Sequence, residues 1–178
     1  MTDILVRDKK FSLFLLESEI LKGIEKVALN INVDMREKEP LFICVLNGAF
    51  MFASELFKLF DFPCELCFIR LKSYDGTKTE GNVKEIYGLI EEVKNRHIVI
   101  LEDIIDTGHT MYGLLEQLKR RSPASLQIAT MLFKKEALQL AVKPDYVAIE
   151  IPNVFIVGYG LDYMGHGRNL RNIYKISE

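Results

Sequence analysis

The sequence predicts an α/β fold in which helices flank a mainly parallel, twisted sheet, and three observations support this prediction. The chain has 178 residues, of which 49% are hydrophobic and 27% charged, as expected for a single globular domain spanning 1–178. Short, uninterrupted apolar runs, typical of strands buried on both faces, recur along it. Turns and amphipathic helical stretches separate these runs, as connections between parallel strands require.

The first half of the chain predicts one β-α-β unit. Ser18 is a candidate N-cap for a helix whose apolar residues recur at three- and four-residue spacing. An apolar strand over 41–46 then turns at Asn47-Gly48 into a helical stretch through Leu59. The apolar face of the first helix comprises Ile20, Leu21, Ile24, Val27, Ala28 and Ile31. We expect this helix to cover the sheet.

A strand over 64–71 completes that unit and is followed by a polar loop. The loop, 72–82, has two glycines and no apolar periodicity. Long loops of this kind in compact domains are often lids. A short strand or hairpin is expected through about 83–88.

The second half repeats the alternation of strands and helices. A buried strand over 97–102 leads through a polar turn into a helix with its inner face at Met111, Leu114, Leu115 and Leu118, which Ser122-Pro123 ends. The remaining predicted elements are strands over 126–132, 146–151 and 154–157 and a short helix near 135–141.

Charge and cysteine content exclude several classes of protein. The formal net charge is -2, from 23 Lys and Arg against 25 Asp and Glu, so a binder of duplex DNA or of an anionic membrane is not indicated. The longest apolar run, 41–46, is far shorter than the roughly 18 residues of a membrane span, and the N-terminus lacks a signal-peptide pattern. We expect a cytoplasmic protein. Cys64 and Cys67 lie three residues apart in a predicted strand, so their thiols should diverge and stay reduced.

The turn after strand 97–102 contains the densest group of polar residues. Thr107, Gly108, His109 and Thr110 place backbone N–H groups, a glycine and two hydroxyls at a helix start, which suits a monophosphate. An ordinary N-capped helix is the alternative. Neither a Walker A nor a dinucleotide-binding glycine pattern is present.

Three carboxylates precede or adjoin this turn. Glu102 and Asp103 end a buried strand, where two unpaired charges are costly. They therefore need a partner, which we expect to be Mg²⁺, a ribose diol or a neighbouring Lys or Arg. Asp106 is a candidate general base or a second capping residue.

The segment Val99–Thr110 closely resembles the phosphoribosyl-diphosphate binding motif of type I phosphoribosyltransferases. Further segments resemble the hypoxanthine-guanine branch of that family, whereas the first forty residues resemble it only loosely. These segments are 45–48, 71–74, 133–134, 143–146, 155–159, 161–163 and Arg168. The resemblance implies a small hood built from the N- and C-terminal segments. It also implies a homodimer or homotetramer that acts in purine salvage.

The implied reaction transfers phosphoribose from 5-phosphoribosyl-1-diphosphate to N9 of hypoxanthine or guanine, giving IMP or GMP and diphosphate. In that reading Glu102 and Asp103 hold the ribose hydroxyls and Mg²⁺, residues 107–110 hold the 5-phosphate, and Asp106 takes the purine proton. Acids suit this chemistry, because a cation develops at C1′ as diphosphate leaves.

The resemblance also assigns the purine site. Lys134 matches the lysine that donates to the purine 6-oxo group, and Phe155 matches the ring that stacks on the base. Ile156 matches the position whose backbone reads the purine edge, and Asp162 matches a contact to the exocyclic region and a second Mg²⁺. Without the resemblance, Lys134 would be interpreted as a solvated surface lysine and Phe155 as a core residue.

The remaining implied residues surround the leaving group. Leu46, Asn47 and Gly48 match the diphosphate loop, where a non-proline cis peptide can expose N–H groups, and Arg168 adds donors to it. Ser73 and Tyr74 match the tip of a lid that excludes water. Two positions depart from the pattern. Asn47 stands where many relatives have Lys or Arg, which weakens the expected diphosphate contacts, and His109 stands where Lys or a small polar residue is common.

Two rival functions differ from this prediction. A regulatory protein with the same donor pocket that binds RNA or DNA would need a basic face, which the charge of -2 disfavours. A different base preference is the second rival: Lys134 argues against adenine, whereas xanthine stays open.

Overall fold

The computed structural model describes residues 3–73 and 83–177. Its larger sheet has six strands in the order β5-β4-β3-β6-β7-β8. All neighbours in it are parallel except β4 and β5, which are antiparallel. The strands are β3 (Leu41–Leu46), β4 (Glu65–Ser73), β5 (Val83–Tyr87), β6 (His97–Ile105), β7 (Ser125–Phe133) and β8 (Tyr146–Glu150). The predicted α/β class with a mainly parallel sheet is confirmed.

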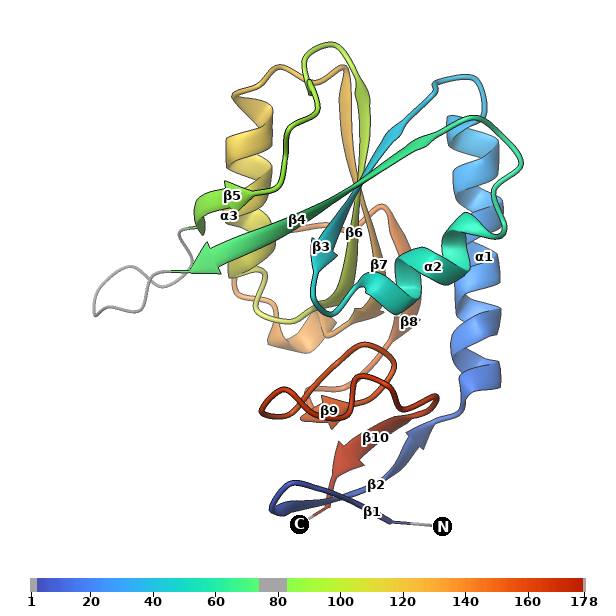
Figure 1. Cartoon of the computed structure of the whole chain (residues 1–178), viewed down its shortest axis with the longest axis vertical. Helices are drawn as coiled ribbons and strands as arrows, with labels where there is room; N and C mark the ends of the chain where they lie inside the picture. The colour runs from blue at the N-terminus through green and yellow to red at the C-terminus, as the bar shows by residue number, and fades with distance from the viewer. Residues whose placement is uncertain (1–2, 74–82, 178) are drawn as a thin grey trace.

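Helices cover both faces of this sheet (Figure 1). Helices α1 (Glu17–Met35) and α2 (Phe50–Phe57) lie on one face and α3 (His109–Lys119) lies on the other. Each face has its own apolar cluster, one including Ile24, Phe42 and Phe52, the other Ile100 and Leu114. Burial of these apolar side chains is the main favourable contribution to folding.

Helix α1 begins two residues earlier than predicted. Its N-cap is Leu16, and Ser18 lies inside the first turn. The carboxylate of Glu19 accepts the Leu16 backbone N–H at 2.8 Å. The prediction of Ser18 as the N-cap was therefore wrong. The N-cap is Leu16, and Glu19, three residues after it, accepts a backbone N–H at this end of the helix.

Two further boundaries differ from the prediction. Strand β6 continues three residues beyond Glu102, since Ile104 and Ile105 pair with Leu132 and Phe133 of β7. The helix expected near 135–141 is only the single 3₁₀ turn Lys135–Ala137. Asp103, which was predicted to follow the strand, thus lies within it, as Glu102 does.

A second, four-stranded antiparallel sheet forms the hood, in the order β1-β2-β10-β9. Its strands are β1 (Ile4–Val6), β2 (Lys9–Leu15), β9 (Ile156–Val157) and β10 (Ile173–Ile176), so both ends of the chain contribute (Figure 1). The predicted strand over 154–157 shrinks to two residues and belongs here instead of to the parallel sheet. Hood residues Ile156 and Ile173 share the α1–α2 apolar cluster, which joins the two sheets.

The three cysteines are free, as predicted. Cys64 packs against one apolar cluster and Cys67 lies in the other, so their thiols point to opposite faces of the sheet. Burial raises the pKa of both Cys44 and Cys67 to about 12. These thiols are therefore poor nucleophiles at neutral pH.

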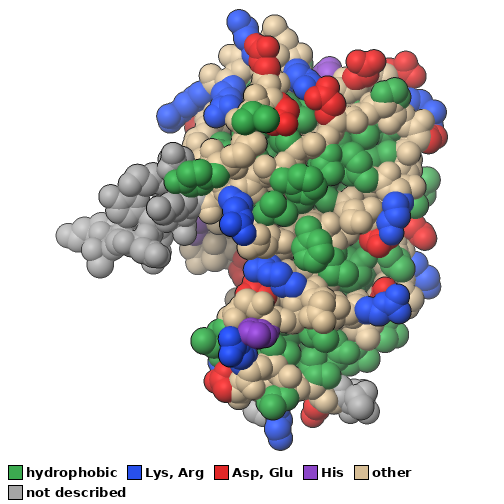
Figure 2. Space-filling model, viewed as in Figure 1, with side chains coloured by type: hydrophobic (Ala, Val, Ile, Leu, Met, Phe, Trp, Pro, Cys, Tyr) green, Lys and Arg blue, Asp and Glu red, His purple; other side chains and the backbone are tan. Residues whose placement is uncertain are grey.

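Charge on the surface is mixed. On the face drawn in Figure 2, Lys and Arg side chains are interspersed with Asp and Glu side chains, without a continuous basic area. In the described part of the chain, every helix is too short or too polar to cross a membrane.

Candidate active site

Three neighbouring strands bring the predicted site residues to one edge of the sheet. Strands β3, β6 and β7 are adjacent and parallel, so their carboxyl ends lie together. The segments 46–48, 102–107 and Lys134 all occur there. The hood lies across this edge (Figure 1), and the surface is hollowed between the hood and the body (Figure 2). Ligands of open parallel sheets bind at such an edge.

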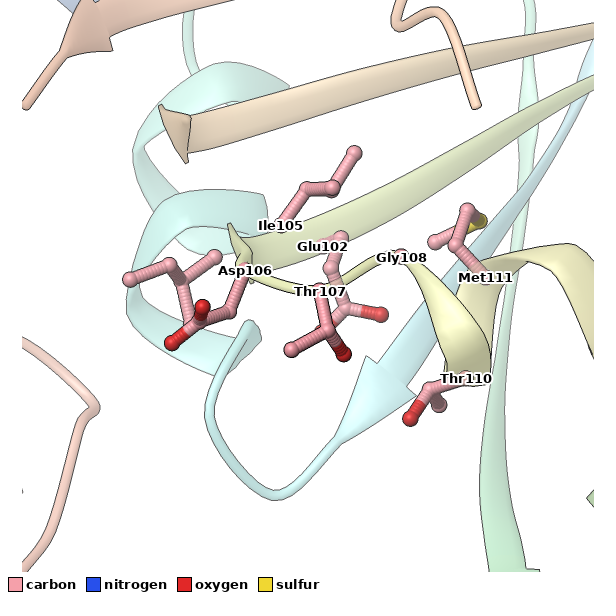
Figure 3. Close-up of a pocket in the computed structure, with 8 residues that line it drawn as sticks. Glu102, Ile105, Asp106, Thr107, Gly108, Thr110 and Met111 are labelled. Atoms are coloured by element: carbon pink, nitrogen blue, oxygen red, sulfur yellow. The ribbon is translucent and has the colours of Figure 1, made fainter. Parts of the chain in front are cut away.

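The turn between β6 and α3 lines a pocket of about 130 Å³. Gly108, the N-cap of α3, has φ +86°, which favours glycine. The side chains of Asp106, Thr107 and Thr110 project from the same turn (Figure 3). The pocket is lined by Glu102, Ile104, Ile105, Asp106, Thr107, Gly108, Thr110 and Met111. Hydroxyls and a helix N-terminus around so small a pocket suit one phosphate group.

Two carboxyl groups meet at this edge with little solvent. Burial, and then the charge of Asp103, raise the pKa of Glu102 well above its ordinary value. Burial also raises the pKa of Asp103, although N–H donation from Ile104 (2.8 Å) and the charge of Arg168 oppose this. Desolvated carboxylates of this kind are stabilised by a cation. Mg²⁺ usually takes one or two carboxylates plus water and substrate oxygens, so these residues fit that ion.

We predict that Glu102→Gln stabilises the protein without Mg²⁺ and lowers turnover. Below the ordinary pKa of 4.5 the Glu102 carboxyl is protonated in both folded and unfolded chains. As pH rises above this value, the unfolded chain releases the proton first, so the folded state loses stability until its own raised pKa is passed. Glutamine removes this cost, and a gain on the order of 1 kcal/mol would raise Tm by about 2–4 °C. Thermal unfolding without Mg²⁺ should show a larger gain at pH 8 than at pH 5; equal gains at both would contradict the assignment.

Position 48 must be glycine, because the Asp103 carboxylate lies too close for any side chain there. A Cβ at position 48 would lie 1.5 Å from Asp103 Oδ2. Gly160 of the hood approaches from the other side, where a Cβ would lie 2.1 Å from the Gly48 carbonyl oxygen. The diphosphate loop is thus enclosed between β6 and the hood.

We expect Gly48→Ala to displace the Asp103 carboxylate and to lower turnover by about 100-fold, the cost of a misplacement near 1 Å. Steady-state kinetics give the loss, and a circular dichroism spectrum identical to wild type shows that the fold persists. Turnover within threefold of wild type would mean that Asp103 is not needed where the structure holds it.

Lys134 and Asp106 form an ion pair. The Nζ of Lys134 donates to Asp106 Oδ2 at 2.6 Å. Lys134 is buried, with 6% of its surface exposed, so the solvated-surface interpretation of this lysine is wrong. Asp106 is half-buried and faces the pocket. The predicted base and the predicted 6-oxo donor are therefore direct neighbours.

The loop 46–48 has the expected cis peptide between Leu46 and Asn47. The Asn47 side-chain oxygen accepts from Arg70 Nη2 at 2.7 Å. Arg168 donates to the Gly160 carbonyl at 2.7 Å and pairs with Asp162 at 2.5 Å. Two guanidinium groups thus lie around this loop.

The hood presents the predicted purine residues. Phe155 is 45% exposed and is not a core residue. Its ring meets Tyr163 edge-on at 5.9 Å and Phe11 at 6.2 Å, which fixes its orientation. Ile156 is buried in β9. Ser73 ends β4, whereas Tyr74 lies outside the described residues, so the predicted lid tip is not described.

Arg70 is the site residue that sequence reasoning missed. Arg70 lies within the predicted strand 64–71, directly before the segment 71–74, and belongs to no motif of its own. Parallel pairing sets Arg70 opposite Leu46, at the entrance to the diphosphate loop. Knowledge of the pairing register between β3 and β4 would have placed Arg70 beside this loop, but apolar runs alone do not fix the register.

Comparisons with known proteins agree with this geometry. The family model of the phosphoribosyl transferase domain matches residues 15–164. The chain is 37% identical over 161 residues to a hypoxanthine-guanine phosphoribosyltransferase of Streptococcus pneumoniae, covering 90% of this chain and 89% of that protein. It is 39% identical over 165 residues to the hypoxanthine-guanine-xanthine phosphoribosyltransferase of Tritrichomonas foetus, covering 91% and 89%. A crystal structure of a Staphylococcus aureus hypoxanthine phosphoribosyltransferase superposes with a TM-score of 0.86 at 31% identity, over 93% of this chain and 91% of that one.

Fold, site and comparisons together define a phosphoribosyltransferase. The chain belongs to the hypoxanthine-guanine branch of the type I family, the purine-salvage enzymes that transfer phosphoribose from 5-phosphoribosyl-1-diphosphate to 6-oxopurines.

Proposed function

We propose that this enzyme converts hypoxanthine and guanine to IMP and GMP, with Asp106 as the general base and Lys134 as the residue that recognises the 6-oxo group. The observation that carries this proposal is the buried Lys134–Asp106 ion pair beside the 107–110 turn. It places a cationic donor and a carboxylate acceptor next to a phosphate-sized pocket. A 6-oxopurine offers the matching pair, an acceptor at O6 and an N–H at N7.

The donor substrate lies along the sheet edge. Thr107, Gly108, His109 and Thr110 hold the 5-phosphate with backbone N–H groups and hydroxyls. Glu102 and Asp103 accept from the ribose hydroxyls, and they are the residues that would hold Mg²⁺. When bound, this ion offsets the charge of the diphosphate leaving group.

The purine displaces the Lys134–Asp106 pair. Lys134 turns its donors to O6, and Asp106 accepts the proton of the imidazole ring as N9 attacks C1′. Phe155 stacks on the base, and the backbone at Ile156 reads its edge. The lysine rejects adenine, because a 6-amino group would leave this buried cation without an acceptor.

Diphosphate leaves toward the loop 46–48. Arg168 directs its guanidinium there, and Arg70 supplies the cation that Asn47 lacks. Asp162 would contact the exocyclic region of the purine and would hold a second Mg²⁺. It would have to release Arg168 or the N–H of Gly165, its present partners, to do so.

Two parts of the proposal rest on the family resemblance. Ser73 and Tyr74 form the lid tip, and the chain assembles as a homodimer or homotetramer. Sedimentation velocity of the purified protein tests the assembly: a species at twice or four times 20.5 kDa is expected, and a monomer at all concentrations would contradict it.

Diphosphate release from 5-phosphoribosyl-1-diphosphate tests the reaction. The expected result is release with hypoxanthine and Mg²⁺, none with EDTA, and none when the base is omitted. Binding of the donor without turnover would instead favour the regulatory protein that keeps the donor pocket and binds nucleic acid.

A further inference from the structure

Two segments run side by side behind the pocket: 105–109, which forms the phosphate turn, and 134–139, which follows β7. At the purine end, the Lys134 backbone N–H donates to the Ile105 carbonyl at 2.9 Å. The Lys134 side chain pairs with Asp106 there. Lys134, whose role in purine recognition is already proposed, therefore holds the purine end of the two segments together.

At the phosphate end, Gln139 bonds to the turn on both sides of Gly108. Its backbone N–H donates to the Thr107 carbonyl at 3.0 Å. Its side-chain Oε1 lies 3.0 Å from His109 Nε2. Because an amide oxygen only accepts, His109 donates to it from Nε2.

Packing around Gly108 supports the same contact. A Cβ on Gly108 would lie 2.9 Å from Leu138 and 3.4 Å from Val142, so these side chains fill the space beside the glycine. Val142 is buried in the cluster that contains Met111 and Leu114 of α3. Residues 138–142 therefore hold the turn against the helix that it starts.

We propose that Gln139 is a positioning residue for the 5-phosphate site. It fixes the Thr107 carbonyl and the His109 imidazole on either side of Gly108, so that the turn keeps its backbone N–H groups available to one phosphate. This inference rests on the proposed role of residues 107–110. It also gives His109, which departs from the family pattern, a defined orientation.

The test compares Gln139→Leu, His109→Ala and the double variant by titration with ribose 5-phosphate and, separately, with diphosphate. Leucine keeps the backbone N–H bond and removes only the side-chain amide. We expect ribose 5-phosphate to bind about 2- to 10-fold more weakly, the usual range for one neutral hydrogen bond. The diphosphate affinity and the Tm of Gln139→Leu should stay at wild-type values. The double variant should bind ribose 5-phosphate no more weakly than His109→Ala.

Three results would overturn the proposal. The first is unchanged ribose 5-phosphate affinity in Gln139→Leu. The second is equal weakening for both ligands, which indicates a general disturbance of the fold. The third is additivity of the two single variants, which would show that Gln139 does not act through His109. Failure of wild-type protein to bind ribose 5-phosphate, with diphosphate binding intact, would reject the phosphate role of the turn and the Gln139 role with it.

Discussion

Asp106→Asn is expected to lower kcat by about 10²- to 10⁴-fold, the usual contribution of a general base. Asparagine has nearly the same volume and still accepts from Lys134, so ligand binding should be preserved. It cannot take a proton from the purine at neutral pH. Steady-state kinetics with hypoxanthine measure the loss, and calorimetric titration with IMP measures the retained binding. A variant within twofold of wild-type kcat would show that Asp106 is not the base.

A matched control separates this effect from a general loss of charge. Asp61 pairs with Arg36 on the exposed surface, away from the carboxyl ends of the parallel strands. Exposed ion pairs of this type contribute little to stability. Asp61→Asn should therefore keep both kcat and KM, and a comparable loss in this control would undermine the interpretation of the Asp106 variant.

Lys134→Met is expected to lower kcat/KM for hypoxanthine by about 10- to 150-fold, which corresponds to about 1.5–3 kcal/mol for a hydrogen bond to a charged group. Methionine fills similar space but leaves O6 without a donor. It also leaves Asp106 without its 2.6 Å partner. The preference for hypoxanthine over adenine should narrow, because the penalty on adenine comes from this cation.

Competition kinetics with both bases measure this preference, and Lys135→Met is the matched control. Lys135 is exposed and adjacent in sequence, so its replacement should leave both rates unchanged. An unaltered hypoxanthine to adenine ratio in Lys134→Met would show that recognition of the 6-oxo group resides elsewhere.

The parallel sheet was predictable because its strands are buried on both faces and read as continuous apolar runs, as 41–46 does. Of the four hood strands, pattern predicted only β9, and it predicted that strand as part of the parallel sheet. Strand β2 alternates poorly between buried and exposed positions, and β9 has only two residues. Their pairing with β10 joins segments far apart in the sequence, so only the family resemblance indicated a hood.

The site divides along the same line. Residues 102–110 are contiguous, so the sequence placed the carboxylates and the phosphate turn together. Because Asp106 and Lys134 follow two adjacent strands, the sequence placed them at the same edge of the sheet. It did not predict that their side chains are in direct contact. Arg70 and Gln139 act through strand register and loop packing, and neither leaves a local signal in the sequence.

The proposed function assigns the selection of 6-oxopurines to the buried Lys134 beside Asp106. Values of kcat/KM measured in parallel for hypoxanthine, guanine, xanthine and adenine, with the same donor and Mg²⁺, test this role. The structure predicts turnover of hypoxanthine and guanine and none of adenine, and the rate with xanthine defines the range of 6-oxopurines accepted. Turnover of adenine at a rate comparable to that of hypoxanthine would contradict the role assigned to Lys134.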